Sequence, residues 1–269
     1  MPVEAGYIEF VDPPLDDAID ALVARGITDV VAVPLVLLGA GHLKDDGPAA
    51  LLQARRRHPV VTFSYARELG VHPAVLAAVE DRVREATGLL TTGRGSPDAV
   101  VVVGRGSSDP DANADLVKAA RLLADGRHLT AQLDGKEPTV DRTDGPAALG
   151  TVEPAFVSLA RPGVNSALDR CHRLGARRIV VVPYFLFHGL LVDRIAEQVR
   201  AWNDDHPDTE VVCGRQMGID ARLVGLTWAR YDELAHGEVS MNCDGCLYRT
   251  PLPGYANRVG MPLPVDRRR

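Results

Sequence analysis

The chain has 269 residues, of which 46% are hydrophobic and 25% charged, a composition that excludes disordered, collagen-like and low-complexity classes. Its 30 Lys and Arg against 36 Asp and Glu give a formal net charge of -6, and the main basic run is the short tail Arg267–Arg269, so no nucleic-acid partner is expected. The longest apolar run, Val30–Gly41, is interrupted by Pro34 and is too short to cross a bilayer, and the N-terminus lacks the regions of a signal peptide. We therefore expect a cytoplasmic protein with no membrane partner that acts on a small molecule.

The two halves of the chain repeat each other. A shift of 149 residues aligns Val31–Pro34 with Val180–Pro183. After one residue of slippage, His58 aligns with His206, and each is followed by proline. The matched residues keep their order and spacing over about sixty residues, so we infer that the chain contains a duplicated unit. The two halves should therefore share one architecture.

Predicted strands and helices alternate along the chain. The run Val30–Leu38 is β-branched and almost continuously apolar, which is typical of a strand buried on both faces of a parallel sheet. This alternation indicates an α/β fold with two similar, doubly wound parallel-sheet domains. The other predicted elements are helices at Leu15–Arg25 (with Gly26 as its C′ residue), Ala49–Arg57 and Pro73–Ala86, and strands at Val60–Tyr65 and Ala99–Val103.

Composition also suggests where the domains divide. The segment Gly93–Asp98 is short, polar and rich in Gly and Pro, so we predict a linker between domains at residues 1–92 and 99–238, followed by a tail at 239–269. The strand Ala99–Val103 has no repeat partner, and the first domain is therefore expected to lack its opening strand and helix. The polar stretch Asp125–Gly150 is predicted to be a long loop, either a functional lid or disordered.

Ligands of doubly wound sheets bind beyond the carboxyl ends of the strands, which directs attention to the loops there. His42 lies in such a loop, on a glycine-flanked turn, where an imidazole can accept protons or bind a metal near neutral pH. The alternative is an exposed loop histidine without a role. Leu191 occupies the equivalent position in the second half, so one half alone is expected to carry this chemistry.

A second loop follows the strand Ala99–Val103. Backbone N–H groups of a glycine turn can bind an anion, and Arg105 adds a planar donor for carboxylate or phosphate. The alternative is a tight strand-to-helix turn capped by Ser108 or Asp109. The candidate substrate-binding residues are Gly104, Arg105, Gly106, Ser107 and Ser108.

Glu9 is a carboxylate inside an otherwise apolar, strand-like segment. A half-buried carboxylate near a histidine is a candidate for handling protons or a metal, and the alternative is a plain glutamate at a strand edge.

Cys243 and Cys246 form a C-x-x-C pair near the C-terminus, suited to zinc, iron–sulfur or redox chemistry. Two thiolates leave a four-ligand site half filled, so completion needs His236, a second chain or a ligand from outside the protein. Cys171 and Cys213 are predicted to be structural.

The segments GYIEFVDPPLDDAID, VVAVPLVLLGAGHLKDD, VVVVGRGSSDP and VVVPYFLFHGLLVDRI resemble the long, two-domain sirohydrochlorin chelatases of CbiX type. This resemblance implies a class II chelatase fold, with two α/β domains facing across a cleft for a flat macrocycle, and a reaction without ATP. It implies catalytic and metal-binding roles for His42 and Glu9. The family's first histidine, in a G-H-G motif, has no counterpart here, and Arg105 stands at the matching position of the second half. The segment MNCDGCLYR resembles an iron–sulfur segment of some long members.

The leading hypothesis is insertion of cobalt, or iron, into sirohydrochlorin. An imidazole and a carboxylate can take up the two pyrrole protons, and they suit Co2+ and Fe2+ alike, so the ligand types leave the metal open. Two alternatives stay open: a non-catalytic carrier of tetrapyrrole or metal, and an iron–sulfur regulatory protein on a chelatase scaffold. A homodimer joined by a shared cluster is part of the C-x-x-C hypothesis.

Overall fold

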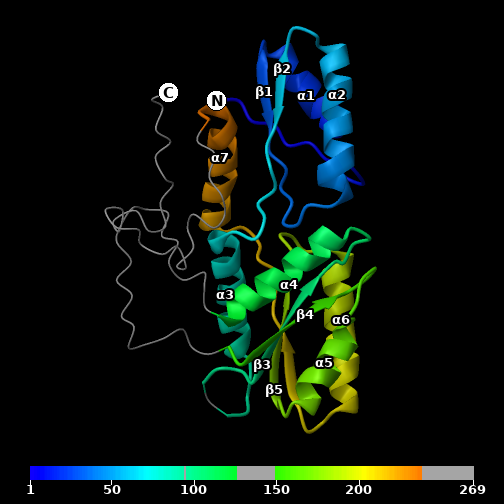
Figure 1. Cartoon of the computed structure of the whole chain (residues 1–269), viewed down its shortest axis with the longest axis vertical. Coiled ribbons are helices and arrows are strands. Elements are labelled where there is room, and N and C mark those ends of the chain that lie inside the picture. Colours follow the sequence, from blue (N-terminus) through cyan, green and yellow to red (C-terminus); the bar gives the residue numbers. More distant parts are fainter. Residues whose placement is uncertain (94, 126–148, 238–269) are drawn as a thin grey trace, which may run out of the picture. The chain divides into compact units, whose positions relative to one another are not determined.

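The computed structural model describes residues 1–93, 95–125 and 149–237 (Figure 1). They form two compact units. Among the described residues, the first unit comprises Met1–Gly70 and residues 226–237, and the second comprises Val71–Gly225. The boundary therefore falls at Gly70, ahead of the predicted linker at Gly93–Asp98, because helix α3 (Pro73–Thr87) packs against strands of the second unit.

The second unit contains a four-stranded, fully parallel sheet with the strand order β4-β3-β5-β6. The central strands β3 and β5 have side chains that are almost entirely inaccessible to solvent, as predicted for a parallel sheet covered on both faces. Helices α5 and α6 pack together, as do α3 and α4, and Figure 1 shows the two pairs on opposite sides of the sheet. The bounds are β3 (Ala99–Gly104), α4 (Pro110–Ala124), β4 (Thr151–Phe156), α5 (Val164–Arg173), β5 (Arg178–Pro183), α6 (Leu190–Asp205) and β6 (Glu210–Cys213).

The first unit has a smaller sheet, in which two parallel strands pair from Asp29↔Thr62 to Ala32↔Tyr65. Its core is a cluster of apolar side chains that includes Ile19, Leu51 and Phe63. The described elements are α1 (Leu15–Ala24), β1 (Asp29–Ala32), the π-helical turn η1 (His42–Asp46), α2 (Gly47–Arg57), β2 (Thr62–Tyr65) and the later part of α7 (Ala221–Ala235).

The later part of α7 is anchored in the first unit by a buried ion pair. Arg230, 1% exposed, donates hydrogen bonds to the Glu233 carboxylate and to the backbone carbonyls of Glu68 and Leu69. Glu233 also accepts two hydrogen bonds from Arg67. Burial alone would raise the pKa of Glu233, but the two guanidinium groups outweigh it and lower that pKa.

Backbone geometry confirms the internal repeat. The isolated parallel bridge between Tyr7 and Pro14 recurs as a bridge between Phe156 and Gly163, 149 residues further on. The helix ends agree as well. Gly26 is the C′ residue of α1 with φ 81°, as predicted, and its counterpart Gly175 after α5 has φ 95°.

The predicted strand Val30–Leu38 is wrong in its length and in its burial. β1 ends at Ala32, because Pro34 has no N–H for a ladder hydrogen bond. Val30 is buried, but Val31 and Ala32 are only half-buried. In the second unit, the counterpart of β1 is β5, which lies inside its sheet because it pairs with β6 on one edge and with β3 on the other. Among the described residues, the first unit has no counterpart of β3 and α4.

We predict that supplying this strand stabilises the first unit. A copy of residues 98–125, which carry β3 and α4, would be fused ahead of Met1 through a flexible linker as long as the 125–150 connection. Pairing along β1 and burial of Val31 should raise the melting temperature by about 5 °C or more. The control fusion replaces Val100–Val103 of the copy with serine. Equal melting temperatures for the two fusions would contradict the prediction.

A second prediction concerns Glu210, at the start of β6, whose carboxylate accepts hydrogen bonds from the backbone N–H groups of Thr91 and Thr92 and from their hydroxyls. Burial raises the pKa of Glu210, but these bonds outweigh it and hold the pKa at about 2. An unfolded glutamate titrates at about 4.3, so the folded state binds fewer protons between these values. This stabilisation is present above about pH 4.3 and is lost as the pH falls toward 2.

Thermal melts of wild type and Glu210→Gln from pH 7 to pH 2 measure this contribution. The variant should melt lower than wild type at pH 7, and the two curves should converge as the pH falls. A constant gap across the whole range would show that Glu210 does not supply the pH dependence.

Candidate functional site

His42 follows β1 after a loop of nine residues and opens the turn η1. Its Nδ1 lies 2.7 Å from Oδ2 of Asp46, and the two side chains are 42% and 47% exposed. A carboxylate can only accept a hydrogen bond, so Nδ1 of the neutral imidazole carries the proton and donates it. The lone pair is then on Nε2, where a proton or a metal ion can bind.

Tyr65, the last residue of β2, lies against the end of this turn. The phenol occupies the space beside Gly47, where any side-chain Cβ would collide with the hydroxyl group. Burial raises the pKa of Tyr65, and the negative charge of Asp46 raises it further. The phenol therefore stays neutral at physiological pH and presents an O–H group beside the His42–Asp46 turn.

The prediction of a half-buried Glu9 within a strand is wrong. Glu9 is exposed and lies in a series of bends after the Tyr7 bridge, where its carbonyl accepts a hydrogen bond from Val11 N at 2.9 Å. The neighbouring Phe10 is 99% exposed. Apolar side chains on a loop thus produced the pattern that suggested a strand. Glu9 belongs to the first unit, as His42 does, and its role stays a prediction.

The turn after β3 is closed by hydrogen bonds from its own residues. Ser107 N donates to Oδ1 of Asn113 at 2.9 Å, and Asn113 Nδ2 donates back to the Ser107 carbonyl at 2.7 Å. Asp109 is the N-cap of α4 and accepts from Asp111 N at 3.0 Å. Two interpretations were predicted for this loop, an anion-binding turn and a capped strand-to-helix turn. The N–H groups of Ser107 and Asp111 fit the second, because they already bond to side chains of the protein. Arg105 is an exposed residue of this turn, and a guanidinium is a donor for anions.

Gly106 in the same turn could not be another residue. Its φ is +86°, and a Cβ would collide with the carbonyl oxygen of Ser158. Ser158 is the repeat counterpart of Glu9, and its N–H donates to the Arg105 carbonyl at 3.0 Å. In the second unit, the position equivalent to Glu9 therefore lies directly against the Gly104–Ser108 turn.

The cysteines separate into two groups. Cys171 on α5 is buried and Cys213 on β6 is half-buried, and burial raises the pKa of each thiol to about 11, so both stay protonated. Cys243 and Cys246 lie outside the described residues, as does most of the predicted Asp125–Gly150 loop.

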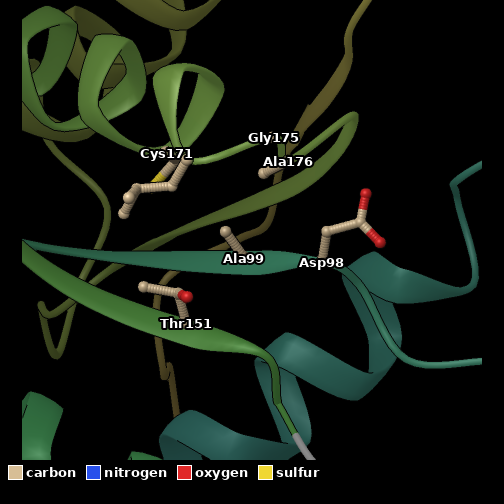
Figure 2. Close-up of a pocket in the computed structure, with 7 residues that line it drawn as sticks. Asp98, Ala99, Thr151, Cys171, Gly175 and Ala176 are labelled. Atoms are coloured by element: carbon tan, nitrogen blue, oxygen red, sulfur yellow. The ribbon is translucent and has the colours of Figure 1, made fainter.

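The second unit contains a cavity of about 310 Å³ (Figure 2). Asp98, Ala99 and Thr151 line it at the amino ends of β3 and β4, and Cys171 contributes a protonated thiol. The Asp98 carboxylate already accepts hydrogen bonds from the backbone N–H groups of Arg177 and Arg178. Since ligands of such sheets bind at the carboxyl ends, the cavity is not the candidate site.

Sequence reasoning missed two residues beside the His42 turn and a third, Glu68, beside Gly39 in the preceding loop. Asp46 could have been found from its spacing of four residues, and Tyr65 from its position at the carboxyl end of a predicted strand. Glu68 has its carboxylate about 4 Å from where a Cβ on Gly39 would lie, and no sequence pattern indicated it. Among the residues that the structure describes, no three His, Cys, Asp or Glu side chains converge on a point where they could hold a metal ion.

Comparison with known proteins decides the family. The CbiX family model matches residues 1–86 and 99–234. The chain belongs to the CbiX family. The sirohydrochlorin cobaltochelatase of Priestia megaterium is 37% identical to it over 247 residues, which cover 92% of this chain and 74% of that protein. The sirohydrochlorin ferrochelatase of Bacillus subtilis (strain 168) is 28% identical, and the match covers 76% of this chain and 69% of that protein.

Solved structures agree with this assignment. SirB from Bacillus subtilis with Fe3+ is similar at a TM-score of 0.66 and 26% identity, covering 87% of this CbiX-family chain and 83% of SirB. SirB from Bacillus subtilis subspecies spizizenii in complex with cobalt is similar at a TM-score of 0.64 and 27% identity, over 87% of this chain and 81% of that one. The predicted α/β fold with parallel sheets, similar to class II chelatases, is confirmed. In the described residues, no helix is long and apolar enough to span a membrane.

Proposed function

We propose that this chain inserts a divalent metal ion, Co2+ or Fe2+, into sirohydrochlorin without ATP. The observation that carries the proposal is the exposed imidazole of His42, in a chain of the CbiX family. Asp46 accepts the Nδ1 hydrogen bond of this imidazole, so the imidazole lone pair is on Nε2. The 37% identity to a cobaltochelatase over 92% of the chain makes cobalt the first metal to test.

The chemistry needs a group that accepts protons and a site that exchanges metal ligands. As the metal binds the pyrrole nitrogens, the macrocycle gives up two N–H protons, so one M2+ and one sirohydrochlorin yield the metallated product and two protons. His42 Nε2 can hold the incoming ion or take up a proton, and Glu9 supplies a second, exposed group for the same tasks. The metal is a substrate in this scheme.

Arg105 is proposed as a binding residue for the substrate. Sirohydrochlorin carries many carboxylates, and an exposed guanidinium binds a carboxylate through two parallel hydrogen bonds. Gly104, Gly106, Ser107 and Ser108 contribute by fixing the backbone from which Arg105 projects.

The direct test is anaerobic incubation of the purified protein with sirohydrochlorin and Co2+ or Fe2+, followed by absorbance. Several turnovers per protein molecule above the rate without protein support the proposal, and the faster metal identifies the substrate. Binding of one macrocycle per chain without turnover would support the carrier hypothesis instead.

We predict that His42→Ala lowers the rate of metal insertion by about 100-fold or more, because it removes a group that holds the metal or accepts protons. The melting temperature should change little, since the side chain is 42% exposed. Glu9→Gln should also slow insertion, since it keeps the shape and removes the charge. Wild-type rates in a folded His42→Ala protein would contradict the proposed role, and an unchanged rate for Glu9→Gln would leave Glu9 as a plain surface residue.

We further propose that Cys243 and Cys246 supply two thiolates to an iron–sulfur cluster. Burial raises the pKa of Cys171 and of Cys213 to about 11, so neither is assigned here as a third thiolate ligand. A second chain or a recruited ligand is then needed to complete four ligands. When bound, the cluster would add a cross-link between chains, and metal insertion does not depend on it.

Replacing both Cys243 and Cys246 with serine should remove the iron, the sulfide and the visible absorbance of anaerobically purified protein. Dimers detected by light scattering should weaken, and insertion of added metal should persist. Wild-type protein that contains neither iron nor sulfide would refute the proposed cluster.

A further inference from the structure

The repeat changes register within one short segment of the first unit. Val31 and Val180 lie 149 residues apart, whereas His58 and His206 lie 148 apart, so the first unit has one extra residue between these points. The turn η1 lies inside this interval, and the N–H of Gly47 bonds to the carbonyl of His42 five residues back. A π-helical turn accommodates one more residue than an α-helical turn, so η1 absorbs the insertion.

Burial patterns place the insertion at η1. Beyond the turn, the buried residues of α2 match those of α6 at a spacing of 148: Gly47 with Ile195, Leu51 with Val199 and Ala54 with Trp202. At the start of the turn the spacing is still 149: Leu43 N and Lys44 N bond to the Ala40 carbonyl, as Val192 N and Asp193 N bond to the Gly189 carbonyl. His42 therefore matches Leu191. The second unit continues through this region as the regular helix α6.

Side-chain sizes have changed together with the turn. Ile195 in the second unit is fully buried, with Cys213 packed against the same core. The first unit has Gly47 and Tyr65 at these two positions, and the phenol fills the space that Ile195 occupies in the repeat. The exchange places a hydroxyl group, rather than an aliphatic chain, against the end of the turn that carries His42 and Asp46.

We infer that η1 is a positioning device for His42, and that Asp46 is a positioning residue that fixes the imidazole so that Nε2 faces the metal or pyrrole. The inference rests on the proposed function for its catalytic meaning. Asp46 holds Nδ1 at 2.7 Å, and as an acceptor it selects the tautomer with the proton on Nδ1. A free imidazole prefers the opposite tautomer. Carboxylates that orient a histidine in this way affect metal affinity or activity by about 10- to 100-fold when they are mutated.

The test compares three variants of the full chain. Asp46→Ala removes the acceptor, and Asp46→Asn keeps a carbonyl oxygen in the same place without the charge. Asp45→Ala is the matched control, because it removes the same charge from an exposed neighbouring residue of η1. The readouts are the His42 tautomer, from long-range proton–nitrogen correlation spectra of protein labelled with 15N-histidine, and the kcat and KM of cobalt insertion.

Asp46→Ala should move the His42 proton to Nε2 and lower kcat by about 10- to 100-fold, with KM for sirohydrochlorin unchanged. Asp46→Asn should retain the Nδ1–H tautomer and most of the rate, and Asp45→Ala should match wild type in both readouts. The inference is overturned if Asp46→Ala leaves the tautomer unchanged, or if Asp45→Ala loses as much rate as Asp46→Ala. The tautomer is measured without turnover. An inactive wild-type protein would therefore refute the proposed function, whereas the spectra would still test whether Asp46 fixes the tautomer of His42.

Discussion

The burial of β3 between two parallel neighbours is the interaction on which the second unit depends. Val100–Val103 are 0% exposed, and the strand pairs with β4 on one edge and β5 on the other. Burying such side chains contributes on the order of 1.5–3 kcal/mol each, whereas a typical exposed ion pair contributes about 0–1 kcal/mol. Because all four strands run parallel, their carboxyl ends lie along one edge of the sheet. The Gly104–Ser108 turn is fixed at this edge as a direct consequence.

The first unit is built on the same plan without that central pairing. β1 has a paired strand on one side, and Val31 is half-buried where its counterpart Val180 is completely buried. The position of His42 therefore depends less on a wide sheet and more on the local turn η1, on the Asp46 carboxylate and on the packing of Tyr65 against Gly47. The two units share a duplicated scaffold. One inserted residue gave the first unit the π-helical turn η1, where the second unit has the regular helix α6.

Much of this fold could be predicted from the sequence, because the signals were strong and local. The valine-rich run at β3, the repeat and the glycine after α1 each correspond to a distinct backbone requirement. β1 was predicted too long because hydrophobicity continues past Pro34, whereas the ladder of hydrogen bonds cannot. Glu9 was misplaced because Phe10 and its neighbours have apolar side chains on an exposed loop. The sequence signal for the π-helical turn was the one-residue slip of the repeat. This slip does not specify the geometry of the turn, which only the structure shows.

The central claim is that the metal chemistry belongs to the first unit, although both units carry an exposed histidine paired with a carboxylate. His188 lies 3.1 Å from Asp193 and provides the matched comparison for His42. The most direct measurement is titration of His42→Ala and His188→Ala with Co2+, monitored by visible absorption and calorimetry. We predict that Co2+ binding weakens by 10-fold or more in His42→Ala and stays at the wild-type level in His188→Ala. Weakened binding in His188→Ala with wild-type binding in His42→Ala would contradict it.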